Sequence, residues 1–130
     1  MIDHLTLLVT NYHQSLAFYR AALEPLGYEV VMELRQEDLP SLPVARTAGL
    51  GPKGKPVLWL RPSTHCDPTH VAFSAPNRRA VAEFHAAATR VGGRDNGAPG
   101  LRPQYHGNYF AAFVLDPDGY NVEAVCHSNE

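Results

Sequence analysis

The stretch "HLTLLVTNYHQSLAFYRAALEPLG" (residues 4–27) decides the fold, because its pattern begins again at residue 70 as "HVAFSAPNRRAVAEFHAAATRVGG" (70–93). The two segments align without a gap and share six of 24 residues. Each copy opens with a histidine on an apolar run, continues through an asparagine into an amphipathic stretch rich in Ala, and ends at glycine. An ordered internal repeat of this kind indicates one supersecondary unit present twice.

Local chemistry predicts a strand followed by a helix in each copy. Residues 4–9 and 70–75 are short and mostly apolar, as strands are. Asn11 and Asn77 are of the residue type that caps helix N-termini, and an amphipathic stretch follows each of them. The glycine that closes each copy is a helix stop signal.

Three strand-like pieces follow each expected helix. They are 28–35, 44–50 and 57–61 in the first half and 94–97, 109–115 and 120–126 in the second. The chain is therefore expected to be an α+β protein, a single domain over 1–130 made of two βαβββ modules, about 1–62 and 67–128. We expect them to form a curved sheet lining a cleft, with the functional site between the copies.

Bulk composition excludes several classes of protein. A chain of 130 residues is the size of one ordinary domain. The net charge of −2 and the absence of a Lys/Arg run argue against nucleic acid as a partner, and no apolar run is long enough for a membrane span. Two cysteines do not make a disulfide scaffold, so a reduced, cytoplasmic protein is expected.

One carboxylate on the expected strands needs a partner. Glu123 lies among apolar residues near the end of the chain, and a buried carboxylate needs a partner or a metal. His4 and His70, at matching places in the repeat, sit on faces that suit a cavity wall. Two histidines and one carboxylate form a facial triad that binds a divalent metal. The alternative is a buried glutamate paired with Arg61 or Arg102.

Three stretches carry a resemblance to a known family: "DHLTLLVTNYHQSLAFYRAALEPLGY", "THVAFSA" and "AFVLDPDGYNVEAV". They resemble the vicinal oxygen chelate superfamily, the group of glyoxalases, bleomycin-resistance proteins and extradiol dioxygenases. The resemblance implies the glyoxalase/dioxygenase-like fold of paired βαβββ modules. It also implies metal ligands on the first and last strand of each module, and His4, His70 and Glu123 match three of these positions. The implied cofactor is one divalent metal ion: Fe, Mn, Ni, Co or Zn.

At the fourth ligand position, this sequence departs from the family pattern. Comparison with glyoxalase I places Trp59 there, and tryptophan is not a metal ligand. The position also lacks the carboxylate that serves as acid and base in that enzyme. We therefore expect the catalytic groups to include Glu123, His106 and Tyr105.

The segment 94–110 is expected to be a loop that lines the cleft, in keeping with the family; otherwise it is an ordinary surface loop with aromatic anchors. The residues expected to bind substrate are Arg102, Tyr109, Trp59 and His127. An arginine suits a carboxylate or phosphate group on such a substrate.

Two functions remain open from the sequence. The first is a small metal-dependent enzyme (a lyase, dioxygenase or transferase) acting on a small oxygenated substrate chelated at the metal. The second is a metal-free protein of the same superfamily that binds or sequesters a small molecule such as a drug. Because family members commonly pair, a homodimer is expected, with each site lying within one chain or shared between two.

Overall fold

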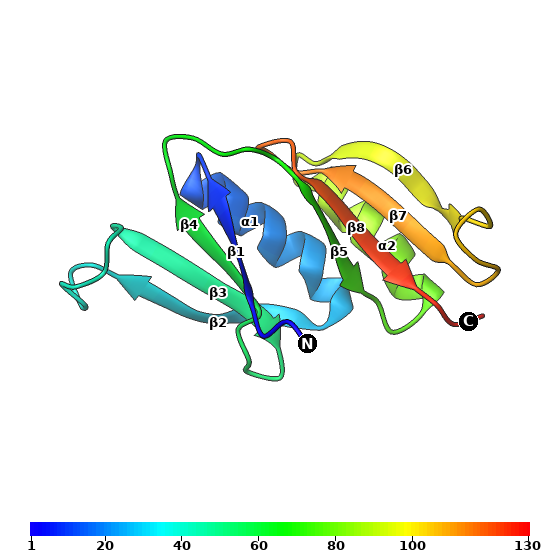
Figure 1. The fold of residues 1–130 in the computed structure, drawn as a ribbon, viewed down its shortest axis with the longest axis horizontal. Coiled ribbons are helices and arrows are strands. Elements are labelled where there is room, and N and C mark those ends of the chain that lie inside the picture. Colours follow the sequence, from blue (N-terminus) through cyan, green and yellow to red (C-terminus); the bar gives the residue numbers. More distant parts are fainter.

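The computed structural model describes residues 1–130 and contains the two expected modules (Figure 1). The first consists of β1 (Leu5–Val9), α1 (Tyr12–Leu23), the short 3-10 helix η1 (Glu24–Leu26), β2 (Tyr28–Arg35), β3 (Arg46–Pro52) and β4 (Leu58–Pro62). The second consists of β5 (His70–Ser74), α2 (Arg78–Arg90), β6 (Arg94–Leu101), β7 (Phe110–Leu115) and β8 (Asn121–Cys126). The predicted α+β fold of two βαβββ modules is confirmed.

Both helices begin where the sequence predicts. The Oδ1 atom of Asn11 accepts a hydrogen bond from the backbone N–H of Gln14 at 3.1 Å, and that of Asn77 accepts one from Ala80 at 2.8 Å. Each bond satisfies one of the N–H groups that a helix leaves free at its first turn. Gly27 ends the first helical segment with a φ of 87°, which a side chain would disfavour.

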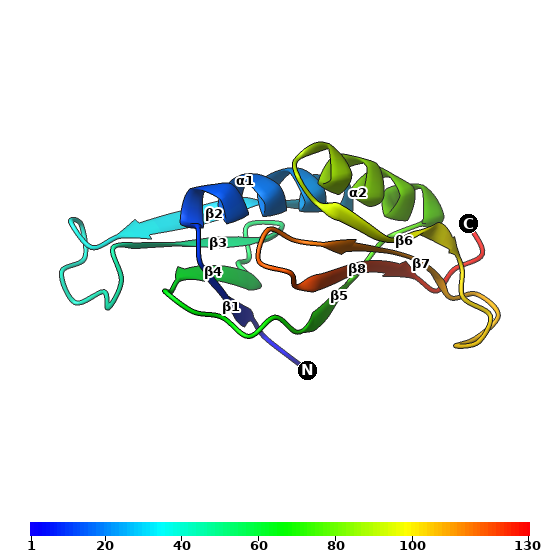
Figure 2. The same ribbon diagram turned by 90° about the horizontal axis from the view of Figure 1, so that it is seen from above.

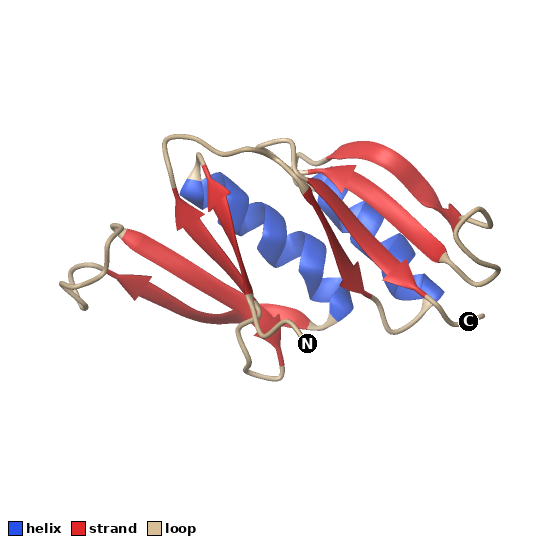
Figure 3. Cartoon of the chain, in the orientation of Figure 1, coloured by secondary structure: helices blue, strands red, loops and turns tan.

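Each module forms its own open four-stranded sheet. The strand orders are β1-β4-β3-β2 and β5-β8-β7-β6, so the first strand of each module pairs in parallel with the last. Figure 2 shows both helices on one side of the two sheets, and Figure 3 shows the same two layers coloured by type. The opposite sheet faces carry no helix, which leaves their side chains free to line a site.

One hydrophobic core runs through both modules. Phe18 of α1 and Phe84 of α2 are fully buried members of a single cluster of 21 residues. Gly93 permits the close packing, since a Cβ there would lie 2.8 Å from Cε1 of Phe18 and 2.5 Å from Cγ1 of Val114. The two modules therefore share one core, with the two helices between the sheets and solvent.

The turn "DPDGY" (116–120) ties the second module to the first. The buried carboxylate of Asp116 accepts a hydrogen bond from the hydroxyl of Tyr19 on α1 at 2.5 Å. Its other oxygen accepts from the backbone N–H groups of Asp118 and Tyr120, at 2.9 and 2.8 Å. The N–H of Gly119 donates to the carbonyl of Asp116 at 3.0 Å, as in a β-turn.

Three further hydrogen bonds complete this junction. The carboxylate of Asp118 accepts from both the backbone N–H and the hydroxyl of Thr10, which follows β1. The hydroxyl of Tyr120 donates to the carbonyl oxygen of Leu8 at 2.8 Å. The turn before β8 thus fixes that strand relative to β1 of the other module.

Two expectations from composition can be compared with the structure. Both cysteines, Cys66 and Cys126, are free. Neither helix is long and apolar enough to span a bilayer.

Replacing Asp116 should weaken the junction between the modules. We expect Asp116→Ala to lower the free energy of unfolding by about 2–4 kcal/mol, because three donors lose their buried acceptor. Asp116→Asn keeps an acceptor for the two backbone groups and should cost about 1 kcal/mol. Urea unfolding measures both, and an Ala variant as stable as the wild type would contradict the role of this turn.

The difference in stability between wild type and Asp116→Asn should depend on pH, because the Asp116 carboxyl is buried. Burial raises the pKa of Asp116, an effect that its hydrogen bonds from Tyr19 and the backbone only partly offset. A raised pKa in the folded state means that this group stabilises the fold at low pH and loses that contribution as pH rises through the raised value. The stability advantage of wild type over Asp116→Asn should therefore be larger at pH 4 than at pH 7.

Candidate functional site

The open face of the second sheet brings His70 and Glu123 together. The register pairs Ala72 of β5 with Glu123 of β8, and Ala72 lies two residues from His70, on the same face of the strand. Nε2 of His70 lies 3.0 Å from Oε1 of Glu123, whose side chain is only 2% exposed. The hydroxyl of Tyr109 donates to the other carboxylate oxygen, Oε2. Glu123 is therefore buried with two polar partners, one on each oxygen.

The orientation of His70 suits metal binding. Its Nδ1 lies 3.0 Å from the backbone carbonyl of Asn121, an acceptor that requires a proton on Nδ1. That leaves Nε2 as the nitrogen directed at Glu123, in the way that second-shell carbonyls orient metal-binding histidines. Two ligands at right angles on one metal, each about 2.1 Å from it, stand about 3 Å apart. The 3.0 Å between Nε2 and Oε1 fits such a pair.

Tyr109 acts here as a hydrogen-bond donor. Burial, followed by the hydrogen bond to Glu123, raises the pKa of Tyr109 to about 12. At neutral pH its hydroxyl therefore keeps its proton and holds the glutamate in place. Tyr109 was predicted to bind substrate; the structure places it against the carboxylate instead of leaving its hydroxyl free.

His4 lies on the first module, at the N-terminal end of β1. Its Nδ1 is 2.7 Å from Oδ2 of Asp3, and Oδ1 of Asp3 accepts from Nζ of Lys55 at 2.7 Å. The hydrogen bond from Lys55, followed by that from His4, holds the pKa of Asp3 below its usual range. This arrangement occupies Nδ1 and leaves Nε2 of His4 free. The carboxylate of Asp3 therefore orients the ring of His4, as the backbone carbonyl of Asn121 orients that of His70.

One chain does not bring the three predicted ligands together. Strands β1 and β5 run in opposite directions in Figure 1. His4 immediately precedes β1 and His70 begins β5, so the two histidines lie at opposite ends of neighbouring strands. No group of three His, Cys, Asp or Glu side chains in the chain is placed to hold a metal ion. His70 and Glu123 form one part of the predicted triad, and His4 stands apart.

The register shows which residue of the first module is equivalent to Glu123. Thr6 pairs with Trp59 in the first module as Ala72 pairs with Glu123 in the second. Trp59 and Glu123 are therefore equivalent positions on the last strands of the two modules. The indole replaces a carboxylate, as the sequence predicts.

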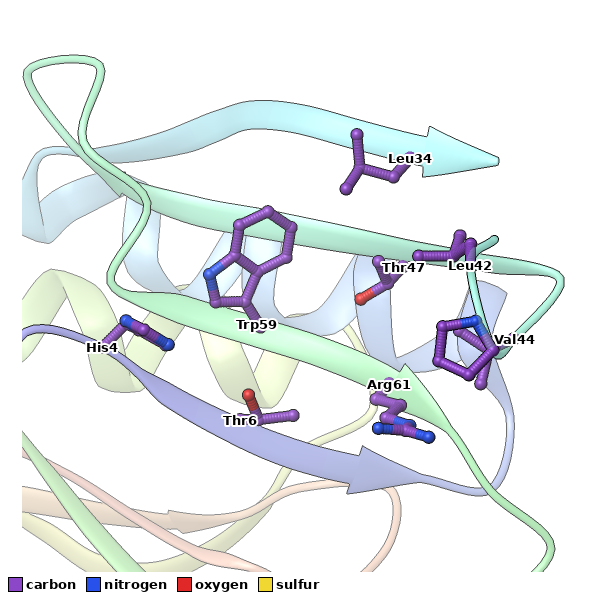
Figure 4. A pocket seen from close by; sticks show the side chains of 9 residues that line it. His4, Thr6, Leu34, Leu42, Val44, Thr47, Trp59 and Arg61 are labelled. Carbon is purple, nitrogen blue, oxygen red and sulfur yellow. The ribbon is translucent and has the colours of Figure 1, made fainter. Parts of the chain in front are cut away.

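Trp59 forms part of a cavity of about 290 Å³ on the open face of the first sheet (Figure 4). Its lining comes from β1 to β4 and from the loop before β3: His4, Thr6, Leu34, Leu42, Pro43, Val44, Thr47, Trp59 and Arg61. The ring lies over Gly49, where a Cβ would come within 3.0 Å of Cη2 of the indole and 2.9 Å of Cβ of Pro56. Glycine is thus what allows the indole to lie flat on the sheet.

Neither arginine pairs with Glu123, so the alternative of a buried Glu–Arg pair is wrong. The guanidinium of Arg102 donates to the carbonyls of Gly100 and Ala98, at 2.8 Å each, and stands 5.4 Å from the centre of the Phe113 ring. Arg102 therefore holds the irregular end of β6, and its predicted grip on a substrate stays a prediction.

The remaining predicted residues cluster beside Tyr109. Nε2 of His106 lies 2.7 Å from Nδ1 of His127, while Nδ1 of His106 accepts from the N–H of Asn108 at 3.1 Å. The proton of His106 is therefore on Nε2, pointing to His127. Both rings pack edge-on against Tyr109, and Tyr105, which is 61% exposed, packs there too. The cluster reaches Glu123 through Tyr109.

Comparison with known families agrees with this architecture. Residues 1–124 match the model of the Glyoxalase/Bleomycin resistance protein/Dioxygenase superfamily. The chain belongs to this superfamily. Comparison with curated proteins gave no match.

Several solved structures share the fold. A glyoxalase/bleomycin resistance protein from Albidiferax ferrireducens superposes with a TM-score of 0.72 at 21% identity, over 95% of this chain and 96% of that one. TioX from Micromonospora gives 0.65 at 18% identity, over 95% and 96%. A maize glyoxalase I mutant gives 0.69 at 24% identity, over 95% of this chain and 46% of the longer maize chain. At these identities the likeness concerns the fold alone.

Sequence reasoning missed the place of two residues near the candidate site. Asp3 directly precedes His4, so a second-shell carboxylate could have been read from adjacency. Arg61 stands two residues after Trp59 on the same strand face, which the alternation of side chains gives. Arg61 had been considered only as a partner of Glu123.

A substitution at Gly49 tests the contact between this glycine and the indole of Trp59. We expect Gly49→Ala to push the indole away, to shift the fluorescence emission of this single tryptophan, and to lower the free energy of unfolding by about 1–3 kcal/mol. Gly107→Ala is the control, because a Cβ there meets nothing within 4 Å. Unchanged emission and stability in Gly49→Ala would contradict the described contact.

Proposed function

We propose that this protein is a metal-dependent enzyme of the glyoxalase/dioxygenase type, acting on a small oxygenated substrate at one divalent metal ion. His4, His70 and Glu123 are the proposed ligands. The observation that carries the proposal is the 3.0 Å approach of Nε2 of His70 to the buried carboxylate of Glu123. A carboxylate with so little exposure, placed beside an oriented imidazole, has the donor set of a divalent metal site.

The third ligand is proposed to come from a second copy of the chain. His4 and His70 lie at opposite ends of neighbouring strands, so a two-fold pairing of chains is the simple way to complete the triad. Each site then combines His70 and Glu123 of one protomer with His4 of the partner subunit. A homodimer with two equivalent sites follows, as the family resemblance also implies.

The chemistry of such a site follows from its residues. A metal bound there would stabilise negative charge that develops on a substrate oxygen. Tyr109 holds the glutamate through a hydrogen bond, and Trp59 leaves the fourth ligand position without a donor. His106 and Tyr105 stay the proposed groups for proton transfer, near Glu123 through Tyr109.

Metal content tests this proposal. The protein purified without chelator and loaded with Fe, Mn, Ni, Co or Zn should hold about one ion per chain. His4→Ala, His70→Ala and Glu123→Ala should each lose it, whereas His65→Ala, an exposed histidine elsewhere, should keep it. Elemental analysis after desalting gives the answer; a wild type that retains no metal, or three variants that all keep it, would refute the enzyme.

Mixing two inactive variants tests whether the site is shared. His4→Ala and Glu123→Ala, each without metal, would form mixed dimers in which one site has all three ligands. Random exchange makes half of the dimers mixed, so the mixture should bind about a quarter of the wild-type metal. A mixture that binds none, although exchange of labelled subunits is complete, would place each site within one chain.

A metal-free binding protein is the second candidate. The observation that favours it is Trp59, an aromatic side chain in place of a ligand, in a cavity with several apolar side chains. If no metal binds and small aromatic compounds do, this candidate replaces the enzyme.

A further inference from the structure

The cavity on the first module has two kinds of wall. Leu34, Leu42 and Val44 form an apolar side, and the indole of Trp59 forms a flat one (Figure 4). The volume of about 290 Å³ is at the small end of the range of ligand pockets. A ligand of one or two fused rings therefore suits it better than a large one.

The polar groups of the cavity are mostly unengaged. The guanidinium of Arg61 and the hydroxyl of Thr6 make no hydrogen bond or ion pair within the chain, whereas the hydroxyl of Thr47 donates to the carbonyl of Leu60 at 2.7 Å. No carboxylate lines the cavity. Arg61 is thus a cation facing a space that holds no negative charge.

The indole of Trp59 is the second feature of the cavity that selects a ligand, beside the guanidinium of Arg61. Gly49 beneath the indole leaves no side chain to tilt it, so one face of the ring is presented to the cavity. Offset stacking of aromatic rings and the approach of a planar ligand to such a face are favourable. An aliphatic ring of the same size would gain only the burial of its surface.

We infer that this cavity binds a planar aromatic anion, with the ring stacked on Trp59 and the carboxylate or equivalent group held by Arg61 and Thr6. The inference rests on the proposed function in taking this face as the substrate side of the site. It assigns the chemical class of the substrate, which the metal ligands alone leave open. A planar anion carrying an oxygen donor can extend from Arg61 past Trp59 toward His4.

Calorimetric titration of the 130-residue protein in EDTA tests this inference without metal. The probes are 2-naphthoate, 2-naphthylmethanol as the neutral planar analogue, and cyclohexanecarboxylate as the anion without an aromatic ring. Arg61→Gln should weaken 2-naphthoate about tenfold and leave the alcohol nearly unchanged, since one charge-assisted contact is lost. Trp59→Leu should weaken both aromatic probes about tenfold.

A matched control separates local effects from general ones. Arg90→Gln removes another exposed arginine, in the last turn of α2 and outside the cavity, and should leave all titrations unchanged. Circular dichroism confirms that each variant is folded. No binding of 2-naphthoate at millimolar concentration, equal binding of cyclohexanecarboxylate, or full affinity in Arg61→Gln would each overturn the inference.

The result is independent of metal content. Binding of 2-naphthoate in EDTA by a protein that never takes up metal would sustain the inference and refute the metalloenzyme. Metal uptake without binding of 2-naphthoate would refute the inference and support the metalloenzyme.

Discussion

Parallel pairing of the first and last strands within each module is the constraint on which the site depends. The register places Trp59 beside Thr6 and Glu123 beside Ala72, and in each module the paired residue of the first strand lies two residues after a histidine. Neighbouring strands lie about 4.8 Å apart, so side chains from these positions meet on the open face. A slip of one residue would turn every one of them to the helix side. The junction at Asp116, just before β8, helps to hold that register.

The two modules have diverged at this point of common geometry. In the second, a buried carboxylate receives a histidine on one oxygen and a tyrosine on the other. In the first, an indole lies on a glycine and borders a cavity with an unpaired arginine. We therefore propose that one module holds the cation and that the other faces an aromatic, anionic substrate. In the proposed site, the metal and the substrate are therefore bound mainly by different modules.

Much of this could be predicted from the sequence. The repeat gave both βαβββ modules, since strand alternation, asparagine caps and terminal glycines are local signals. The strand 28–35 was bounded correctly, whereas 94–97 extends to Leu101, because glycine, proline and alanine there hide a bulged strand from a periodicity argument. The family pattern also predicted that Trp59 corresponds to Glu123 of the second module, and the register shows this equivalence.

Other parts depended on three-dimensional contacts. That Arg102 would turn back onto the carbonyls of its own strand, or that His4 and His70 would stand at opposite ends of neighbouring strands, depends on bulges and on how the modules pack. The separation of the histidines is the finding that makes a second chain part of the proposal.

The decisive measurement is a crystal structure of the metal-loaded protein, with anomalous scattering collected at the absorption edge of the bound metal. We predict one peak per chain, within bonding distance of Nε2 of His70, a carboxylate oxygen of Glu123 and Nε2 of His4 of the partner subunit. A peak held by His106 and His127, or no peak beside Glu123 in fully loaded crystals, would contradict this prediction.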